Sequence, residues 1–171
     1  MNQRIPLFIA FSVMVLAVSS CCTPKNKHAY MRKAYKKLNR SVKTAQVTNL
    51  DDTIKVLFPC NLMFPFNSTS IDSALLPSMN KFAKVLNKFD RTAVLVSGYT
   101  DSIGADDYNN NLSAQRADTA KNKLMLYNVA NDRIKTWGMG KRHPVATNQT
   151  EEGRALNRRV EFIILYQESK K

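Results

Sequence analysis

The stretch that decides the fold is GYTDSIGADDYNNNLSAQRA, residues 98–117. It follows a short β-branched and apolar run at 92–96, which predicts a strand with Asp101 just beyond its end. A short loop then leads into a helix expected from 107 to about 126. In that helix Arg116 lies four residues from an apolar side chain in either direction, so its guanidinium shares a face that should be buried. An arginine on a buried face needs a partner.

Asp101 and Arg116 admit two interpretations. The first is an internal salt bridge between the two side chains. The second is a ligand site, because a carboxylate and a guanidinium held near each other match a zwitterion that presents an ammonium and a carboxylate. An amino-acid head group has this form, and the guanidinium can bind its carboxylate through two parallel hydrogen bonds. Both interpretations remain open from the residues alone.

Apolar periodicity and turn residues predict the other elements of the domain. They are an extended segment at 54–66, a helix at about 75–86, a strand near 134–137 and a final strand at 159–165. Trp137 and Tyr108 are expected to pack in the core. The β-α-β-α-β-β order predicts an α/β fold of the α+β sandwich type, with one mixed β-sheet and helices packed on one face.

The same stretch opens a longer pattern. GYTDSIGADDYNNNLSAQRA is followed by GMGKRHP at 138–144 and by NQTEEGRALNRRVEF at 148–162. These three blocks, in this order, resemble the OmpA C-terminal domain family, which includes the peptidoglycan-associated lipoproteins. The resemblance covers roughly 57–166. It implies a domain that binds peptidoglycan without cleaving it, by holding the diaminopimelate residue of the stem peptide.

The resemblance also implies roles for individual residues. Asp101 would pair with the diaminopimelate ammonium and Arg116 with its carboxylate. Thr100, Asn109 and Arg158 fall on motif positions that line the same pocket in the family.

One departure from the family pattern concerns the edge of that pocket. The family's first strand usually carries an F-D-F triplet, whereas this chain has Phe64-Pro65-Phe66. The aspartate and one backbone N–H are therefore missing there. We expect that edge to contact the peptide differently.

The N-terminus has the form of a lipoprotein signal. A short basic region at 1–4 and a largely apolar region at 5–18 lead to Ser19-Ser20 and Cys21, which is the small-residue spacing for cleavage before the cysteine. We expect 1–20 to be a lipoprotein signal peptide and Cys21 to carry acyl chains such as palmitate. The alternative is a retained transmembrane anchor, but the apolar run is shorter than the roughly 20 residues that span a bilayer.

The chain is strongly basic, with a formal net charge of +13. Such a balance would suggest nucleic-acid binding, but a secretory signal argues against that partner. The basic residues concentrate in 25–43, which could form a helix near the anchor; a solvated spacer and contact with anionic head groups or cell-wall polymer are the two interpretations. We therefore expect a lipidated N-terminus and basic tether at 21–52 and one OmpA-like peptidoglycan-binding domain at 53–171.

The sequence places no set of residues for catalysis. A muramidase needs two carboxylates that flank the glycosidic bond, and a peptidase needs a nucleophile with a base or a metal. No motif provides either arrangement, and His28 and His143 lack a second metal ligand at suitable spacing. We expect no enzyme activity, no cofactor and no metal.

Together these expectations describe an outer-membrane lipoprotein whose domain faces the periplasm. It would bind peptidoglycan and anchor the outer membrane to the cell wall, with envelope proteins as further partners. The alternative is a wall-anchored component of a larger envelope complex, of stator or transport type, that uses the same domain. A stator would keep an uncleaved membrane-spanning helix.

Overall fold

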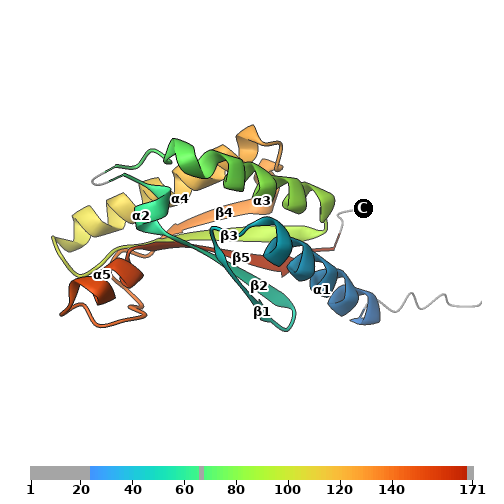
Figure 1. Cartoon of the computed structure of the whole chain (residues 1–171), viewed down its shortest axis with the longest axis horizontal. Helices are drawn as coiled ribbons and strands as arrows, with labels where there is room; N and C mark the ends of the chain where they lie inside the picture. Colours follow the sequence, from blue (N-terminus) through green and yellow to red (C-terminus); the bar gives the residue numbers. More distant parts are fainter. Residues whose placement is uncertain (1–23, 66–67, 169–171) are drawn as a thin grey trace, which may run out of the picture.

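The structure, a computed structural model, describes residues 24–65 and 68–168 (Figure 1). The predicted signal, Cys21 and Phe66 lie outside the described residues. The elements are α1 (Pro24–Ser41), β1 (Gln46–Leu50), β2 (Thr53–Pro59), α2 (Cys60–Met63), η1 (Ser73–Leu75), α3 (Leu76–Lys88), β3 (Thr92–Tyr99), α4 (Asp106–Leu126), η2 (Asn131–Arg133), β4 (Ile134–Gly138), α5 (Glu151–Asn157) and β5 (Arg159–Tyr166). Within the described ranges, no helix combines the length and the apolar character needed to cross a bilayer.

One five-stranded sheet has the strand order β1-β2-β5-β3-β4. β5 is the last strand in sequence but pairs antiparallel with both β2 and β3, so it occupies the centre. β3 and β4 pair in parallel, which makes the sheet mixed. The predicted α/β class, with one mixed sheet and the predicted strands and helices in their expected order, is confirmed; α5 adds a short helix between the last two strands.

The core lies between the sheet and the helices on one of its faces. β2 alternates strictly between buried and half-buried residues, as a strand with one covered face must. Phe58 and Phe162 from neighbouring strands and Phe82 from α3 pack edge-on or tilted, with ring centroids 5.1 to 6.1 Å apart. Such ring pairs add specific geometry to a large buried apolar area. They fix α3 over the middle of the sheet.

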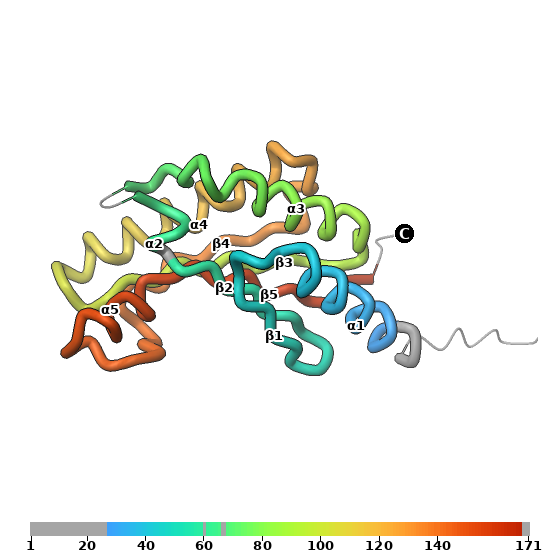
Figure 2. Tube along the Cα trace, in the orientation of Figure 1, coloured from blue at the N-terminus to red at the C-terminus, as the bar shows by residue number. Residues whose placement is uncertain are grey.

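Residues 24–50 are part of this folded unit, so the prediction of a tether across 21–52 is wrong for them. Met31, Ala34 and Leu38 are at most 2% exposed and belong to the core. Their spacing of three and four residues places them on one face of α1, which packs beside α3 and β1 (Figure 2). β1 then extends the sheet by pairing antiparallel with β2. The charged surface of α1 concealed its narrow apolar stripe in the sequence.

Tyr30 fixes α1 to the far end of the sheet. Its ring packs edge-on against Phe89 at 5.3 Å and Tyr166 at 5.8 Å. Its hydroxyl accepts a hydrogen bond from the backbone N–H of Arg91 at 3.0 Å. The Arg91 guanidinium also stacks on Tyr166 at 5.0 Å. These contacts give α1 one defined position on the domain.

Glu161 alternates with the core residues Val160 and Phe162 along β5, and a charged network surrounds it on the other face of the sheet. Its carboxylate accepts hydrogen bonds from Lys55 at 2.7 Å and from Arg159 at 2.8 Å. Arg159 is 3% exposed and lies 3.7 Å from the Tyr99 ring centre. Burial raises the pKa of Glu161, but the two hydrogen bonds outweigh it and hold that pKa below its ordinary value.

The prediction that Trp137 and Tyr108 pack in the core is wrong. Their exposed fractions are 58% and 53%. Trp137 lies on β4, an edge strand. It is three residues after the buried Ile134, so it lies on the opposite face of the strand and points away from the core. Tyr108 lies in the first turn of α4, at the rim of the cavity described below.

Candidate ligand-binding site

A cavity of about 540 Å³ opens where β3 ends, between the start of α4, α2 and α5. In Figure 1 these segments lie at the end of the molecule opposite the start of α1. The lining residues are Asn61, Phe64, Pro65, Thr100, Asp101, Ile103, Tyr108, Asn109, Leu112, Arg116, Glu151 and Arg158. All five residues predicted from the sequence for this site are among them.

Asp101 and Asn109 shape the loop between β3 and α4. One carboxylate oxygen of Asp101 accepts the backbone N–H of Ile103 at 3.0 Å. The Asn109 amide donates to the carbonyls of Ile103 at 2.9 Å and Gly104 at 3.4 Å. Gly104 has a φ of +94°, a conformation that glycine adopts without strain. Asn109 is 2% exposed, so its contribution to the cavity is to hold this loop.

The glycine-rich block at 138–144 holds the end of β3. The Thr100 N–H donates to the Gly140 carbonyl at 2.9 Å, and the Gly140 N–H donates to the Ser113 hydroxyl at 2.9 Å. Gly140 has a φ of +55°, and a Cβ there would lie 2.4 Å from the side-chain oxygen of Asn110. A larger residue would therefore displace the Asn110 side chain and would adopt a backbone conformation that favours glycine. The Thr100 hydroxyl donates to the Asp101 carbonyl at 2.9 Å and stays buried beside the cavity.

Arg158 is the arginine that pairs with Asp101. It donates to the second carboxylate oxygen of Asp101 at 2.8 Å and to Glu151 at 2.7 Å. Burial opposes the charge of Arg158, but these two hydrogen bonds outweigh it and raise its pKa. The hydrogen bond from Arg158, followed by that from Arg154, lowers the pKa of Glu151. An internal salt bridge between Asp101 and Arg116, one of the two interpretations of the sequence, is therefore not what the structure shows.

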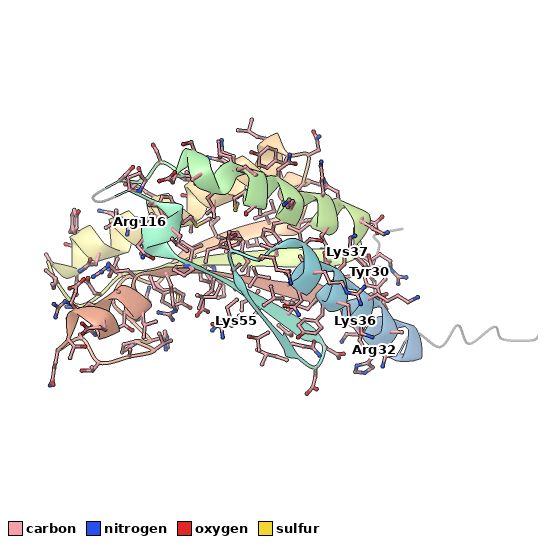
Figure 3. The ribbon with its side chains drawn as sticks, in the orientation of Figure 1. Tyr30, Arg32, Lys36, Lys37, Lys55 and Arg116 are labelled. Carbon is pink, nitrogen blue, oxygen red and sulfur yellow. The ribbon has the colours of Figure 1, made fainter. Side chains whose placement is uncertain are left out.

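Arg116, which is labelled in Figure 3, also lines the cavity but is not part of this hydrogen-bonded cluster. It is 7% exposed, its Nε donates to the Ser68 carbonyl at 3.2 Å, and its guanidinium lies 5.3 Å from the Phe64 ring centre. Within 24–65 and 68–168, no carboxylate forms an ion pair with it. Phe64 belongs to the triplet that departs from the family pattern, and Pro65 also lines the cavity. Arg116 is thus a nearly buried cation whose contacts among the described residues are with neutral groups, the Ser68 carbonyl and the Phe64 ring.

The charges divide the cavity into two parts. Asp101, Glu151 and Arg158 form a hydrogen-bonded cluster in one part, and Arg154 also pairs with Glu151, so the formal charges of this network sum to zero. Arg116 supplies one positive charge beside Phe64, outside that cluster. A cavity with carboxylate acceptors in one part and a guanidinium in another suits a ligand that carries both an ammonium and a carboxylate.

The third sequence block forms hydrogen bonds that hold the loop next to the cavity. Asn157 is 1% exposed. The oxygen of its side-chain amide accepts hydrogen bonds from the backbone N–H groups of Val145 at 2.8 Å and Ala146 at 3.0 Å. Its amide donates at 2.9 Å to the Asn148 side chain, which also accepts the Ser102 N–H at 3.2 Å. The loop that carries Asp101 is therefore held through two asparagines. Sequence reasoning missed Asn148 and Glu151, although both lie in the block NQTEEGRALNRRVEF.

The fold and the cavity together define an α/β sandwich domain with a charged ligand site at the end of its third strand. Residues 63–158 match the sequence model of the OmpA family. This range is more than half of the chain and includes the five predicted site residues. The chain belongs to the OmpA family, as the three sequence blocks predicted.

Individual relatives extend this finding. The probable lipoprotein YiaD of Escherichia coli K12 is 42% identical over 118 residues, which are 69% of this chain and 54% of YiaD. The chain thus spans about half the length of that relative. The peptidoglycan-associated lipoprotein of Buchnera aphidicola is 28% identical over 173 residues, covering 97% of this chain and 99% of that protein. The structure of the cell wall anchor of the T6SS from Pseudomonas aeruginosa has a TM-score of 0.65 and 29% identity, covering 83% of this chain and 97% of that one.

Proposed function

We propose that this protein is an outer-membrane lipoprotein that binds peptidoglycan non-covalently through the diaminopimelate of the stem peptide. The observation that carries this proposal is Arg116, a guanidinium that is 7% exposed, lines the cavity and pairs with no carboxylate of the described residues. A desolvated cation in that position costs free energy unless an anion joins it. The carboxylate of a ligand would be that anion, bound through the free N–H groups of the guanidinium.

Asp101 can receive the ammonium of the same ligand. Each of its carboxylate oxygens accepts one hydrogen bond within the protein, from Ile103 and Arg158, and an ionised carboxylate has about four acceptor sites. Acceptor capacity therefore remains. Thr100, Asn109 and Arg158 would position Asp101 and the loop around it. Both cavity carboxylates are hydrogen-bonded to Arg158, which favours binding without cleavage.

The location and the anchor belong to the proposal as well. Cleavage before Cys21 and lipidation of its thiol would attach the protein to the outer membrane, with the domain in the periplasm. The name of YiaD and that of the Buchnera relative both include the word lipoprotein, which supports this part. Envelope proteins are further partners, because the cell wall anchor of the T6SS shares the fold along most of its length. A role as the wall anchor of such a complex is the alternative that this similarity favours.

Co-sedimentation with diaminopimelate-type peptidoglycan tests the proposal. Residues 22–171 should sediment with it, and the Arg116→Gln variant should bind about 10-fold to 100-fold more weakly, because hydrogen bonds to charged groups contribute about 1.5–3 kcal/mol. Arg40→Gln is the matched control, since it removes the same charge from an exposed site on α1.

Circular dichroism must show both variants folded, and free diaminopimelate should compete with the polymer. Equal binding by Arg116→Gln and the parent protein would exclude Arg116 from ligand recognition. Equal loss in Arg116→Gln and Arg40→Gln would show that any wall affinity comes from net charge alone.

A further inference from the structure

The solvent side of α1 is a continuous basic surface. We call it the basic face and define it by five exposed residues: Arg32, Lys33, Lys36, Lys37 and Arg40. Every charged side chain of α1 is basic. The spacing of three and four residues places these five on the side of the helix opposite its buried stripe.

The basic face has no acidic partner among the residues that the structure describes. The ion pairs of α1 lie at its first turns, where Lys27 and His28 pair with Asp52. Arg32 and Lys36 are separated by four residues, so their like charges repel and disfavour the helix. Like-charge repulsion that no contact within the fold offsets is a feature expected at a functional surface. The partner that fits such a surface is anionic.

The predicted lipid anchor places this surface close to a membrane. Cys21 precedes Pro24, the first residue of α1, by three positions, which span at most about 10 Å when fully extended. Electrostatic attraction to anionic lipids extends over a screening length of about 8 Å at physiological salt. A lipid on Cys21 would therefore hold the start of α1 within reach of the head groups. One acyl attachment combined with a basic surface is a stronger membrane signal than either alone.

The position of α1 on the domain argues against the cell-wall polymer as the partner. Figure 3 shows Arg32, Lys36 and Lys37 at the end of the molecule opposite Arg116. A peptidoglycan strand bound in the cavity would lie at that opposite end. The stripe of α1 packed in the core and the Tyr30 contacts also fix the helix, so binding at the basic face would orient the whole domain.

We propose that the basic face of α1 binds the anionic phospholipid head groups of the membrane to which the protein is anchored. Binding there turns the cavity away from the bilayer, towards the wall. This inference rests on the proposed lipidation of Cys21 and is independent of peptidoglycan binding.

The test uses the full lipidated chain, purified in detergent and added to preformed vesicles. One set contains phosphatidylcholine alone and the other contains phosphatidylcholine with phosphatidylglycerol. A water-soluble amine reagent and mass spectrometry then report the modification rate of each lysine. Lys33, Lys36 and Lys37 should react about fivefold or more slowly on the anionic vesicles, because each basic residue near such a surface favours contact by about that factor. Exposed Lys81 and Lys88 of α3 are internal controls and should react equally on both.

Two further arms complete the experiment. Salt at 1 M, where the screening length is about 3 Å, should remove the protection. An Arg32→Gln, Arg40→Gln double variant should weaken the protection of the remaining lysines, whereas Lys81→Gln, Lys88→Gln should not. Mass spectrometry of the N-terminal peptide checks the lipid on Cys21 separately.

Equal lysine reactivity on both kinds of vesicle overturns the proposal. Equal protection of the α3 lysines on anionic vesicles also overturns it, since the attraction would then be unspecific. Protection by added peptidoglycan but not by anionic vesicles would assign the basic face to the wall polymer instead.

Discussion

The stability of the domain should depend on Leu38, a residue in the segment that the sequence suggested was a tether. Leu38 is 1% exposed within the core cluster. A Leu38→Ala substitution removes three carbons, worth about 2.4 kcal/mol at about 0.8 kcal/mol per buried CH₂. Because the surrounding side chains collapse only in part, a cavity term is added, and buried leucine-to-alanine changes typically cost about 2–5 kcal/mol. We expect the free energy of unfolding to fall by an amount in this range.

Urea denaturation of residues 22–171, followed by circular dichroism, measures this change. With a dependence of about 2 kcal/mol per molar urea, the midpoint should fall by roughly 1–2.5 M. Lys37→Ala is the matched control, because Lys37 is the preceding residue of the same helix and is exposed. Its effect should stay within about 0.5 kcal/mol. A Leu38→Ala effect as small as that of Lys37→Ala would refute the packing of α1 on the domain.

Three further predictions concern Asn157, Glu161 and Arg116. Asn157→Ala should loosen the loop at 145–148 and weaken peptidoglycan binding without touching the cavity, seen as faster amide hydrogen exchange in that loop and weaker co-sedimentation. The folded-state pKa of Glu161 lies below its unfolded value of about 4.3. The stability that the ionised Glu161 contributes is therefore fully present at a pH above about 4.3 and is lost as the pH falls through the folded-state pKa. Urea midpoints should therefore fall less for Glu161→Gln than for the parent between neutral pH and about pH 3. Arg116→Leu should abolish binding while leaving the melting temperature of the ligand-free domain unchanged or higher.

Much of the fold was predictable because several elements, β2 and α3 among them, follow the period of a strand or a helix. In β2 the buried positions recur at every second residue, and in α3 the buried residues follow helical spacing. Pro77 also predicted where α3 starts, because a proline is tolerated only in the first turn of a helix. The five site residues predicted from the sequence pattern line one cavity in the structure. Local periodicity and motif spacing carry this kind of information.

The remaining features depend on tertiary contacts that spacing does not encode. Asp101 pairs with Arg158, which lies 57 positions later, rather than with the nearer Arg116. β1 shows no apolar alternation, and Val47 is its one half-buried residue, so its strand character comes from pairing with β2. α5 is a seven-residue helix that contains Gly153 and is fixed by the Thr150 cap. Short elements of this kind form because their neighbours hold them.

The position of Arg116 links stability to binding in this domain. Its charge is desolvated, and within the described residues the Ser68 carbonyl and the Phe64 ring offset that cost only in part. Pro65 stands where the family pattern has an aspartate, so the described residues at this edge of the cavity, Phe64 and Pro65, offer no carboxylate to the guanidinium. A ligand carboxylate would supply the missing interaction and, by mass action, stabilise the folded state. If Arg116 instead served the fold, Arg116→Leu would lower the melting temperature strongly and added diaminopimelate would leave the melting temperature of the parent domain unchanged. A nearly buried cation with no ion pair among the described residues is the feature that the proposed ligand carboxylate would explain.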